Sequence, residues 1–159
     1  MGLRERRLQA DAREMARFRR PDGPVRIVEM EGEPPERYLL EFAVPSLVVQ
    51  NREVRRSDRH LVDIFLTLAY PRQAPQCRML TPVFHPNIAP HAICAGDHWT
   101  PGESLPGLVV RIAEMLAYQN YNVKSPLNGD AARWVEANRG AVPLTREDFW
   151  TLLKEGQEE

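Results

Sequence analysis

The sequence is poor in two residue types that carry much of protein chemistry, lysine and cysteine. Only Lys124 and Lys154 are lysines, so nineteen of the twenty-one basic residues are arginine. We attribute this bias first to genome composition. The two cysteines, Cys77 and Cys94, are too few for a disulfide framework, and nothing in the chain points to an oxidising compartment. We therefore expect two free thiols.

Long hydrophobic runs are also missing. A membrane-spanning helix needs roughly 18 or more consecutive apolar residues, and no window of the chain comes near that length. The amino terminus is rich in arginine and has no apolar stretch with a cleavage site behind it, so it does not resemble a secretory signal. Length and composition are those of one globular domain with a buried core. We expect a single domain over residues 1–159, in the cytoplasm and without membrane contact.

A strong net charge is absent as well. The formal net charge is −1, which argues against nucleic acid as the main partner. The charge is nevertheless uneven, because seven of the first twenty residues are arginine. This amino-terminal end is therefore a candidate docking surface for another protein.

The hydrophobic pattern predicts an α+β fold. Residues 3–20 carry one apolar stripe on an otherwise charged helix. Short β-rich runs follow, and we interpret them as a four-stranded antiparallel meander with one further partner strand: residues 25–30, 37–44, 47–50 and 60–70, then 79–84. Three later helices are expected at residues 105–118 with Ser104 as N-cap, at 128–140, and at 145–156 with Thr145 as cap and Gly156 as stop. Helices segregated from one antiparallel sheet define the α+β class.

Residues 70–138 contain four short motifs in a fixed order. They are YPRQAP at 70–75, HPNI at 85–88, WTPGESL at 99–105 and SPLNGDAA at 125–132, with AIC ending at Cys94 between the second and the third. This ordered series resembles the ubiquitin-conjugating enzymes, the E2 proteins of ubiquitin-like transfer. The resemblance implies the UBC-like fold, and it places Cys94 close to where the family keeps its active-site cysteine.

The intervals around Cys94 depart from the family pattern. The step from Asn87 to Cys94 is about one residue shorter than usual, the step from Cys94 to Trp99 about three shorter, and Ala95 replaces a more typical leucine. Divergent family members occur in bacterial operons that also carry a ubiquitin-like protein and an activating enzyme. This compact, arginine-rich chain resembles such a member.

The resemblance implies an acyl transfer that needs no cofactor. A thiolate at Cys94 receives the carboxy-terminal glycine of a ubiquitin-like modifier from an E1-like activating enzyme, and a lysine amine of a target attacks the thioester. Small Ala95 and Gly96 leave room for an incoming extended tail. Asn87 is the candidate that stabilises the oxyanion or braces the loop that does. Ser125 takes an orienting role towards the amine, because serine is a poor base at neutral pH.

Each of these residues also has a structural explanation. Taken without its neighbours, Cys94 suggests a buried thiol, and an asparagine after proline is a favourable turn residue that needs no catalytic role. Ser125 falls where the amino-terminal cap region of the next helix is expected. Asp97 and His98 could supply a base for the amine, but a solvated loop charge explains them equally well.

Four side chains that can bind zinc fall within fourteen residues of the sequence, at His85, His91, Cys94 and His98. Structural zinc sites usually draw two close pairs from distant parts of a chain, whereas this is one irregular run with a single thiolate. We therefore expect no metal site. His85, beside a proline turn, is expected to act as a hydrogen-bonding brace.

The resemblance also implies protein partners. The first helix of E2 proteins docks on the activating enzyme, so the candidate partner-binding residues are Arg4, Arg7, Arg13 and Arg17, which can meet an acidic patch; a solvated amphipathic face is the alternative. In the family, an apolar residue after the Tyr-Pro pair helps to receive RING-type ligases. Arg72 takes that place here, which argues against a conventional RING contact.

The alternative function is that of an inactive binding scaffold. Inactive E2 variants keep the fold but typically lack the cysteine.

Overall fold

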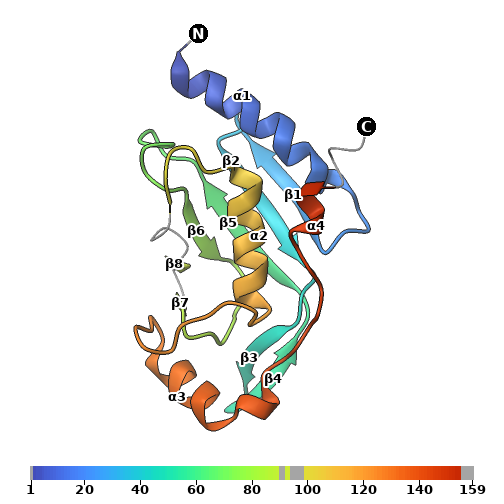
Figure 1. Cartoon of the computed structure of the whole chain (residues 1–159), viewed down its shortest axis with the longest axis vertical. Helices are drawn as coiled ribbons and strands as arrows, with labels where there is room; N and C mark the ends of the chain where they lie inside the picture. The colour runs from blue at the N-terminus through green and yellow to red at the C-terminus, as the bar shows by residue number, and fades with distance from the viewer. Residues whose placement is uncertain (1, 90–91, 94–98, 155–159) are drawn as a thin grey trace.

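The sheet and its helices follow the expected α+β order. The computed structural model describes residues 2–89, 92–93 and 99–154. Helix α1 (Leu3–Met15) continues into the 3₁₀ turn η1 (Ala16–Arg19) and leads to the first strand. One antiparallel sheet in the order β1-β2-β5-β6 is then built from four strands, β1 (Val25–Glu31), β2 (Arg37–Phe42), β5 (His60–Phe65) and β6 (Gln76–Met79) (Figure 1).

One strand of the expected meander lies outside this sheet. β3 (Ser46–Gln50) pairs with β4 (Glu53–Ser57) in a separate hairpin, so the prediction that residues 47–50 join the main sheet was wrong. Asn51 and Arg52 connect the two strands with positive φ angles of 51° and 67°, as a two-residue hairpin turn requires. β4 is polar and mostly exposed, which is why its sequence looks like a turn.

The last strand of the main sheet lies earlier than residues 79–84, where the sequence pattern placed it. In β6 the side chains alternate, with Cys77 and Met79 buried and the other two exposed. A four-residue strand with two polar side chains gives a weak hydrophobic signal. After β6 the chain crosses to the β3–β4 hairpin, where Phe84 N donates to Leu47 O at 2.7 Å.

Helix α2 (Leu105–Leu116) lies across one face of the sheet and completes the core (Figure 1). Ser104 is its N-cap as expected, and its Oγ accepts a hydrogen bond from Gly107 N at 3.0 Å. Fully buried side chains of α2 and of the inner face of the sheet belong to one cluster, which includes Leu108, Ile112, Leu116, Tyr38, Leu40, Phe42, Val62 and Ile64. This close-packed frame supports the loops at its edge.

The third helix is slightly shorter than the sequence predicted. α3 (Gly129–Ala137) begins after its N-cap Asn128, whose Oδ1 accepts a hydrogen bond from Ala131 N at 3.1 Å. The short 3₁₀ turn η3 (Arg139–Ala141) follows it. α3 and η3 lie at the opposite end of the molecule from α1 (Figure 1).

The fourth helix begins later than residue 145. Within the described residues α4 covers Thr151–Lys154, and Thr145 does not cap it. Instead, Thr145 Oγ1 accepts a hydrogen bond from Glu147 N at 3.2 Å, one of the local turns with which threonine competes against helix. Gly156, the expected stop, lies outside the described residues. Among the helices of the described residues, none has both the length and the apolar character of a membrane span.

Candidate active site

A short hairpin leads into the segment that contains Cys94. β7 (Ile88–Ala89) pairs with β8 (Ala92–Ile93), and β8 lies beside β6 of the main sheet. Ile88 and Ile93 face each other across the pair and are both buried, so the core holds the hairpin in place. Cys94 follows β8 directly in sequence and lies outside the described residues, as do His91, Asp97 and His98.

His85 is a fully buried brace, as the sequence predicted. Its Nδ1 accepts a hydrogen bond from Asn87 N at 3.0 Å, so Nε2 carries the proton and donates to Met115 O at 2.7 Å. The imidazole also packs against the ring of Tyr118, with 4.5 Å between centroids. Burial lowers the pKa of His85 to about 4, against its ordinary value of 6.5. The neutral ring thus ties the start of the site to the end of α2.

This buried histidine makes stability depend on pH. Below pH 6.5 the unfolded chain binds a proton at His85 that the folded chain does not bind until about pH 4, so stability falls across that window. The full effect is about 3 kcal/mol, at 1.36 kcal/mol for each unit of pKa. We expect a melting temperature that drops as the pH is lowered from 7 to 4.5, measured by circular dichroism. The buried His60, whose pKa burial also lowers, adds in the same direction.

The non-titrating variant His85→Phe should lose part of this pH slope, in addition to its loss of stability at pH 7. A slope unchanged by this substitution would show that His85 does not bind the proton.

Asn87 clamps a second loop onto the candidate site. Its side-chain amide makes a reciprocal pair with the backbone of Asn122, because Nδ2 donates to Asn122 O and Oδ1 accepts from Asn122 N, each at 2.8 Å. The carbonyl of Pro86 accepts two further bonds from the same loop, from Leu127 N at 2.8 Å and Asn128 N at 3.0 Å. Asn87 itself is only 5% exposed. The structure thus gives it a bracing role, and one N–H of its amide is used for this.

Ser125 lies on the loop that Asn87 clamps. It is exposed, and the cap of α3 is Asn128 rather than Ser125. Ser125 is therefore not the N-cap of α3, which was the structural explanation considered for it from the sequence. Its orienting role towards an amine stays a prediction. The partner that positions this loop, Asn122, was not singled out in the sequence, because nothing in residues 119–122 distinguishes it from any polar loop.

Cys77 is the second thiol of the chain, and it lies inside the core on β6. Burial raises the pKa of Cys77 to about 12. At neutral pH it is therefore a protonated thiol, and thiols react far more slowly than thiolates. Its surroundings suit a structural residue.

The structure excludes His85, one of the four side chains that could bind zinc, as a metal ligand. Both ring nitrogens of His85 are engaged with the protein backbone, so neither is available to a metal. The other three, His91, Cys94 and His98, lie outside the described residues. Within the part of the chain that the structure describes, no group of three acidic, histidine or cysteine side chains is arranged to hold a metal.

Arg7 ties α1 to the segment that follows the candidate site. Its guanidinium donates to Pro101 O and to Glu103 O, each at 2.6 Å, and to Asp11 Oδ1 at 3.0 Å. These bonds join the first helix to the chain just before α2. The sequence did not indicate this internal role, since an arginine and an aspartate at i and i+4 also suit a solvated helix face.

Two aromatic side chains complete this junction. The hydroxyl of Tyr70 donates to the buried carboxylate of Asp11 at 2.5 Å, and Trp99 Nε1 donates to Pro71 O at 2.8 Å. Arg7 lies over both rings, 5.2 Å from the centroid of Tyr70 and 6.0 Å from that of Trp99, in cation–π geometry. The YPRQAP and WTPGESL motifs therefore meet at α1, and Trp99 fixes the downstream end of the Cys94 segment.

The remaining arginines of the predicted docking surface have different surroundings. Arg4 on α1 donates to Thr67 O at 2.9 Å. Arg17 on η1 donates to Leu153 O of α4 at 3.0 Å, so both side chains join this end of the chain to other parts of the fold. Arg13 is exposed. Partner binding by the four arginines stays a prediction, and Arg13 is the best placed for it.

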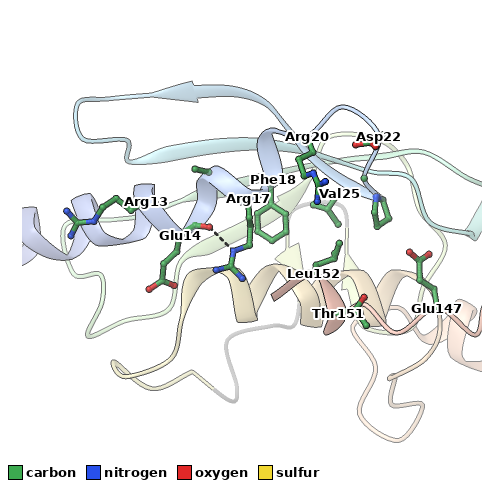
Figure 2. Close-up of a pocket in the computed structure, with 13 residues that line it drawn as sticks. Arg13, Glu14, Arg17, Phe18, Arg20, Asp22, Val25, Glu147, Thr151 and Leu152 are labelled. Atoms are coloured by element: carbon green, nitrogen blue, oxygen red, sulfur yellow. Dashed lines mark hydrogen bonds between the residues drawn. The ribbon is translucent and has the colours of Figure 1, made fainter. Parts of the chain in front are cut away.

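A groove of about 770 Å³ lies where the end of α1 meets α4, as Figure 2 shows. Arg17 forms one wall and donates to the carbonyl of Glu14. Charges of both signs line the groove, from Arg13, Arg17, Arg20, Glu14, Asp22 and Glu147. They balance, so the groove is not a patch of one sign. Helix α4, which borders it, and the β7–β8 hairpin lie on opposite sides of α2 in the view of Figure 1.

A solved structure shares this fold. The E2 domain of a ubiquitin-conjugating enzyme from Toxoplasma gondii superposes with a TM-score of 0.62 over 96% of this chain and 92% of that chain. The two sequences are 20% identical, so this similarity concerns the fold alone. It confirms the expected UBC-like fold.

Sequence comparisons define the family. A family model described as ubiquitin-conjugating enzyme matches residues 56–144. The chain is 34% identical over 97 residues to ubiquitin-conjugating enzyme E2 13 of Saccharomyces cerevisiae, and 30% identical over 97 residues to ubiquitin-conjugating enzyme E2 N of Macaca fascicularis. The chain belongs to the ubiquitin-conjugating enzyme family.

The alignments with these two relatives cover 58% of this chain and 61% of each relative. The matched part thus spans about three fifths of their length. The family membership supports a conjugating role, whereas the activity, substrates and partners of the whole relatives come to this chain only as proposals.

Proposed function

We propose that this chain is an E2-type conjugating enzyme that carries a ubiquitin-like modifier as a thioester on Cys94. The Cys94 thiolate first attacks the activated carboxy-terminal glycine of the modifier and displaces the thiol of an E1-like enzyme. A lysine amine of a target then attacks the thioester carbonyl, which forms an isopeptide bond and releases the thiolate. The observation that supports this most is the family match over residues 56–144, which spans the candidate site.

The chemistry of the two cysteines supports Cys94 as the nucleophile. Cys77 is buried, and its pKa of about 12 keeps it protonated at neutral pH. Cys94 directly follows a hairpin that the core holds in place, and the small residues Ala95 and Gly96 come next in the sequence. Such a segment leaves room for an incoming extended tail.

Asn87 and Ser125 are assigned roles in the second step. Asn87 holds the loop of residues 122–128 against the site, and its amide is our candidate for stabilising the oxyanion that forms when an amine attacks. Ser125 is exposed on that loop and orients the amine by hydrogen bonding. The reaction needs no cofactor.

We also propose that residues 1–159 form one conjugating domain that works in the cytoplasm of a bacterium. The shortened intervals on both sides of Cys94 support a divergent member of the family. In this setting the partners are an E1-like enzyme, a ubiquitin-like modifier and a target lysine, with no nucleic acid or membrane.

The loops beside α1 argue against a conventional RING ligase as a partner. Arg72 is exposed at the place where the family usually has an apolar contact, and Thr100 is exposed in the second loop. Leu68 is 86% exposed four residues before Arg72. Any partner at this end would meet that leucine rather than an apolar residue after Pro71.

The activating enzyme is expected to dock on α1 and the adjoining turn η1 through Arg4, Arg7, Arg13 and Arg17. Charge reversal in Arg13→Glu should slow loading roughly three- to tenfold at low salt, because it weakens electrostatic steering towards an acidic surface. The difference should shrink as salt is raised, since exposed charges are screened within about 8–10 Å near physiological ionic strength. Discharge of a preloaded thioester should not change. Loading rates from stopped reactions on gels measure both effects.

Arg139→Glu is a matched control, because Arg139 is also exposed but lies on η3 at the other end of the molecule. Equal slowing in the two variants would indicate a general effect of net charge and remove α1 from the docking surface.

The proposed function is tested by mixing the protein with an E1-like enzyme, a ubiquitin-like modifier and ATP. We expect an adduct on a gel that dithiothreitol destroys, as a thioester requires. If no such adduct forms with an activating enzyme that loads a known E2, the inactive-scaffold alternative replaces the proposal.

A further inference from the structure

Tyr118 has a backbone conformation that tyrosine rarely adopts. It follows Ala117, the C-cap of α2, and its φ angle is positive, at 58°. Among the described residues, only two other non-glycine residues share a positive φ, and both form the turn between β3 and β4. Glycine usually takes the place after a helix end, because a side chain is strained there. A bulky side chain at this position indicates a role that glycine could not supply.

The side chain of Tyr118 is buried against the turn that leads to Asn87. Tyr118 is only 4% exposed. Its hydroxyl donates to Phe84 O at 2.5 Å, and its ring packs on His85 with 4.5 Å between centroids. Burial raises the pKa of Tyr118, so the hydroxyl is protonated and donates at neutral pH. Because His85 Nδ1 accepts from Asn87 N at 3.0 Å, Tyr118 holds the residue that in turn holds the backbone of Asn87.

The backbone of Tyr118 leads into the loop that holds the Asn87 side chain. A residue in the left-handed conformation ends a helix and redirects the chain. The ring of Tyr121, further along the loop, meets the ring of Tyr118 edge to face, with 5.2 Å between centroids. The next residue is Asn122, whose backbone makes the reciprocal pair with the Asn87 amide. The ring contact thus fixes the loop directly before the residue that binds Asn87.

Tyr118 therefore lies where two connections to Asn87 meet. One connection runs through the turn of residues 84–87 to the backbone N–H of Asn87, and the other runs through Tyr121 and Asn122 to its side chain. The side-chain amide is planar, and Asn122 holds both its oxygen and one of its N–H groups. The direction of the remaining N–H is consequently fixed as well.

We propose that Tyr118 is a positioning residue for Asn87. This inference rests on the proposed function, in which the Asn87 amide stabilises the oxyanion that forms during discharge. Tyr118 acts through Asn87, because its hydroxyl and ring hold the turn of residues 84–87 against the loop of residues 119–122 and so aim the remaining N–H. An oxyanion donor must lie within about 3 Å of the developing charge, so a small displacement of this amide slows the reaction.

The variant Tyr118→Phe tests the inference, since it keeps the ring and removes the hydroxyl bond to Phe84 O. Discharge of a preloaded thioester onto lysine should slow roughly tenfold, because the Asn87 donor is displaced rather than lost. Loading by an E1-like enzyme should slow less. Ser104→Ala is the matched control: it removes the N-cap at the other end of α2 and should lower the melting temperature without changing discharge. Normal discharge in Tyr118→Phe, or equal slowing in Ser104→Ala, would overturn the inference.

A double-mutant cycle distinguishes positioning of Asn87 from a general structural role. If Tyr118 acts through Asn87, Tyr118→Phe slows discharge in the unchanged chain and has no further effect in Asn87→Ala, which lacks the amide. A purely structural tyrosine would slow both proteins by the same factor. Effects that multiply in the double variant would therefore contradict the proposal.

Tyr118→Gly separates the side chain from the backbone. Glycine adopts a positive φ without strain, so this variant keeps the course of the chain and loses the hydroxyl, the ring contact with His85 and the ring contact with Tyr121. We expect discharge to slow more than in Tyr118→Phe. Discharge at the normal rate would show that the turn of the backbone is sufficient, and the side chain would have no positioning role.

The Asn87 amide can also be observed without any reaction, in amide NMR spectra of the unloaded protein. Its side-chain signals are identified by their loss in Asn87→Ala. They should shift and exchange faster with water in Tyr118→Phe and stay unchanged in Ser104→Ala. Unchanged signals in Tyr118→Phe would overturn the inference and leave the proposed function intact. Absence of a reducible adduct in every protein, the unchanged chain included, would contradict the proposed function and this inference together.

Discussion

Replacing Cys94 by alanine is expected to abolish the adduct that dithiothreitol destroys, with no detectable loading. The expected loss is complete because the thiolate forms the covalent bond, and no other described thiol can take its place. Cys77 is buried and protonated at neutral pH. Melting temperature should change little, since a thiol that must be open to a bulky acyl donor is expected to contribute little packing. Gel assays of loading and thermal unfolding measure the two effects.

Cys77→Ala is the matched control for this prediction. It removes a thiol from the core, so we expect a loss of about 1 kcal/mol in stability with loading retained. Cys94→Ala should thus lose loading and keep its stability, whereas Cys77→Ala should keep loading and lose stability. A reducible adduct on the Cys94 variant, or a requirement for Cys77, would show that the nucleophile is misassigned.

The serine variant adds a chemical signature. Cys94→Ser replaces the thiol by a hydroxyl, so any adduct that forms on it is an oxyester that resists dithiothreitol and is cleaved by hydroxylamine. An adduct of this kind on Cys94→Ser, absent from Cys94→Ala, would locate the acyl group at residue 94.

Much of the fold could be predicted because its signals are local. The apolar face of α2, its N-cap Ser104 and the β-rich runs of β1, β2 and β5 are all visible over short windows. β4 and β6 could not be found in this way, because their side chains are mostly polar or alternate over only four residues. Their strand conformation comes from pairing with neighbours, which a single window does not contain.

The residues of the candidate site also differ in how well the sequence predicts their roles. The role of His85 follows from a turn motif of three residues, and the structure confirms it. Asn87 was identified, but its partner Asn122 lies thirty-five residues away and contributes only backbone atoms. Any residue type except proline could supply those atoms, so the sequence holds no signal for the pair. Arg7 illustrates the same limit, because its acceptors Pro101 O and Glu103 O are also backbone atoms.

Asn87→Ala is expected to slow discharge of the modifier onto an amine by on the order of a hundredfold or more, the usual effect of losing one oxyanion donor. Loading from the activating enzyme should slow less, because in our proposal the loop of residues 122–128 acts on the attacking amine, which takes part only in discharge. The same change removes two partly buried hydrogen bonds to Asn122. We expect a cost of about 1–3 kcal/mol in stability, measured by thermal unfolding beside single-turnover loading and discharge.

A second variant separates the local effect of Asn87 from general destabilisation. Asn128→Ala removes the cap of α3 at the far end of the same loop and should cost about 1 kcal/mol, yet it leaves the amide of Asn87 untouched. If Asn87 acts on the reaction, discharge slows strongly in Asn87→Ala and only slightly in Asn128→Ala. If both variants slow loading and discharge equally, in proportion to their loss of melting temperature, Asn87 is a turn brace without a catalytic role. The two steps must be measured separately, because a brace affects the folded population in both, whereas an oxyanion donor towards the attacking amine acts only in discharge.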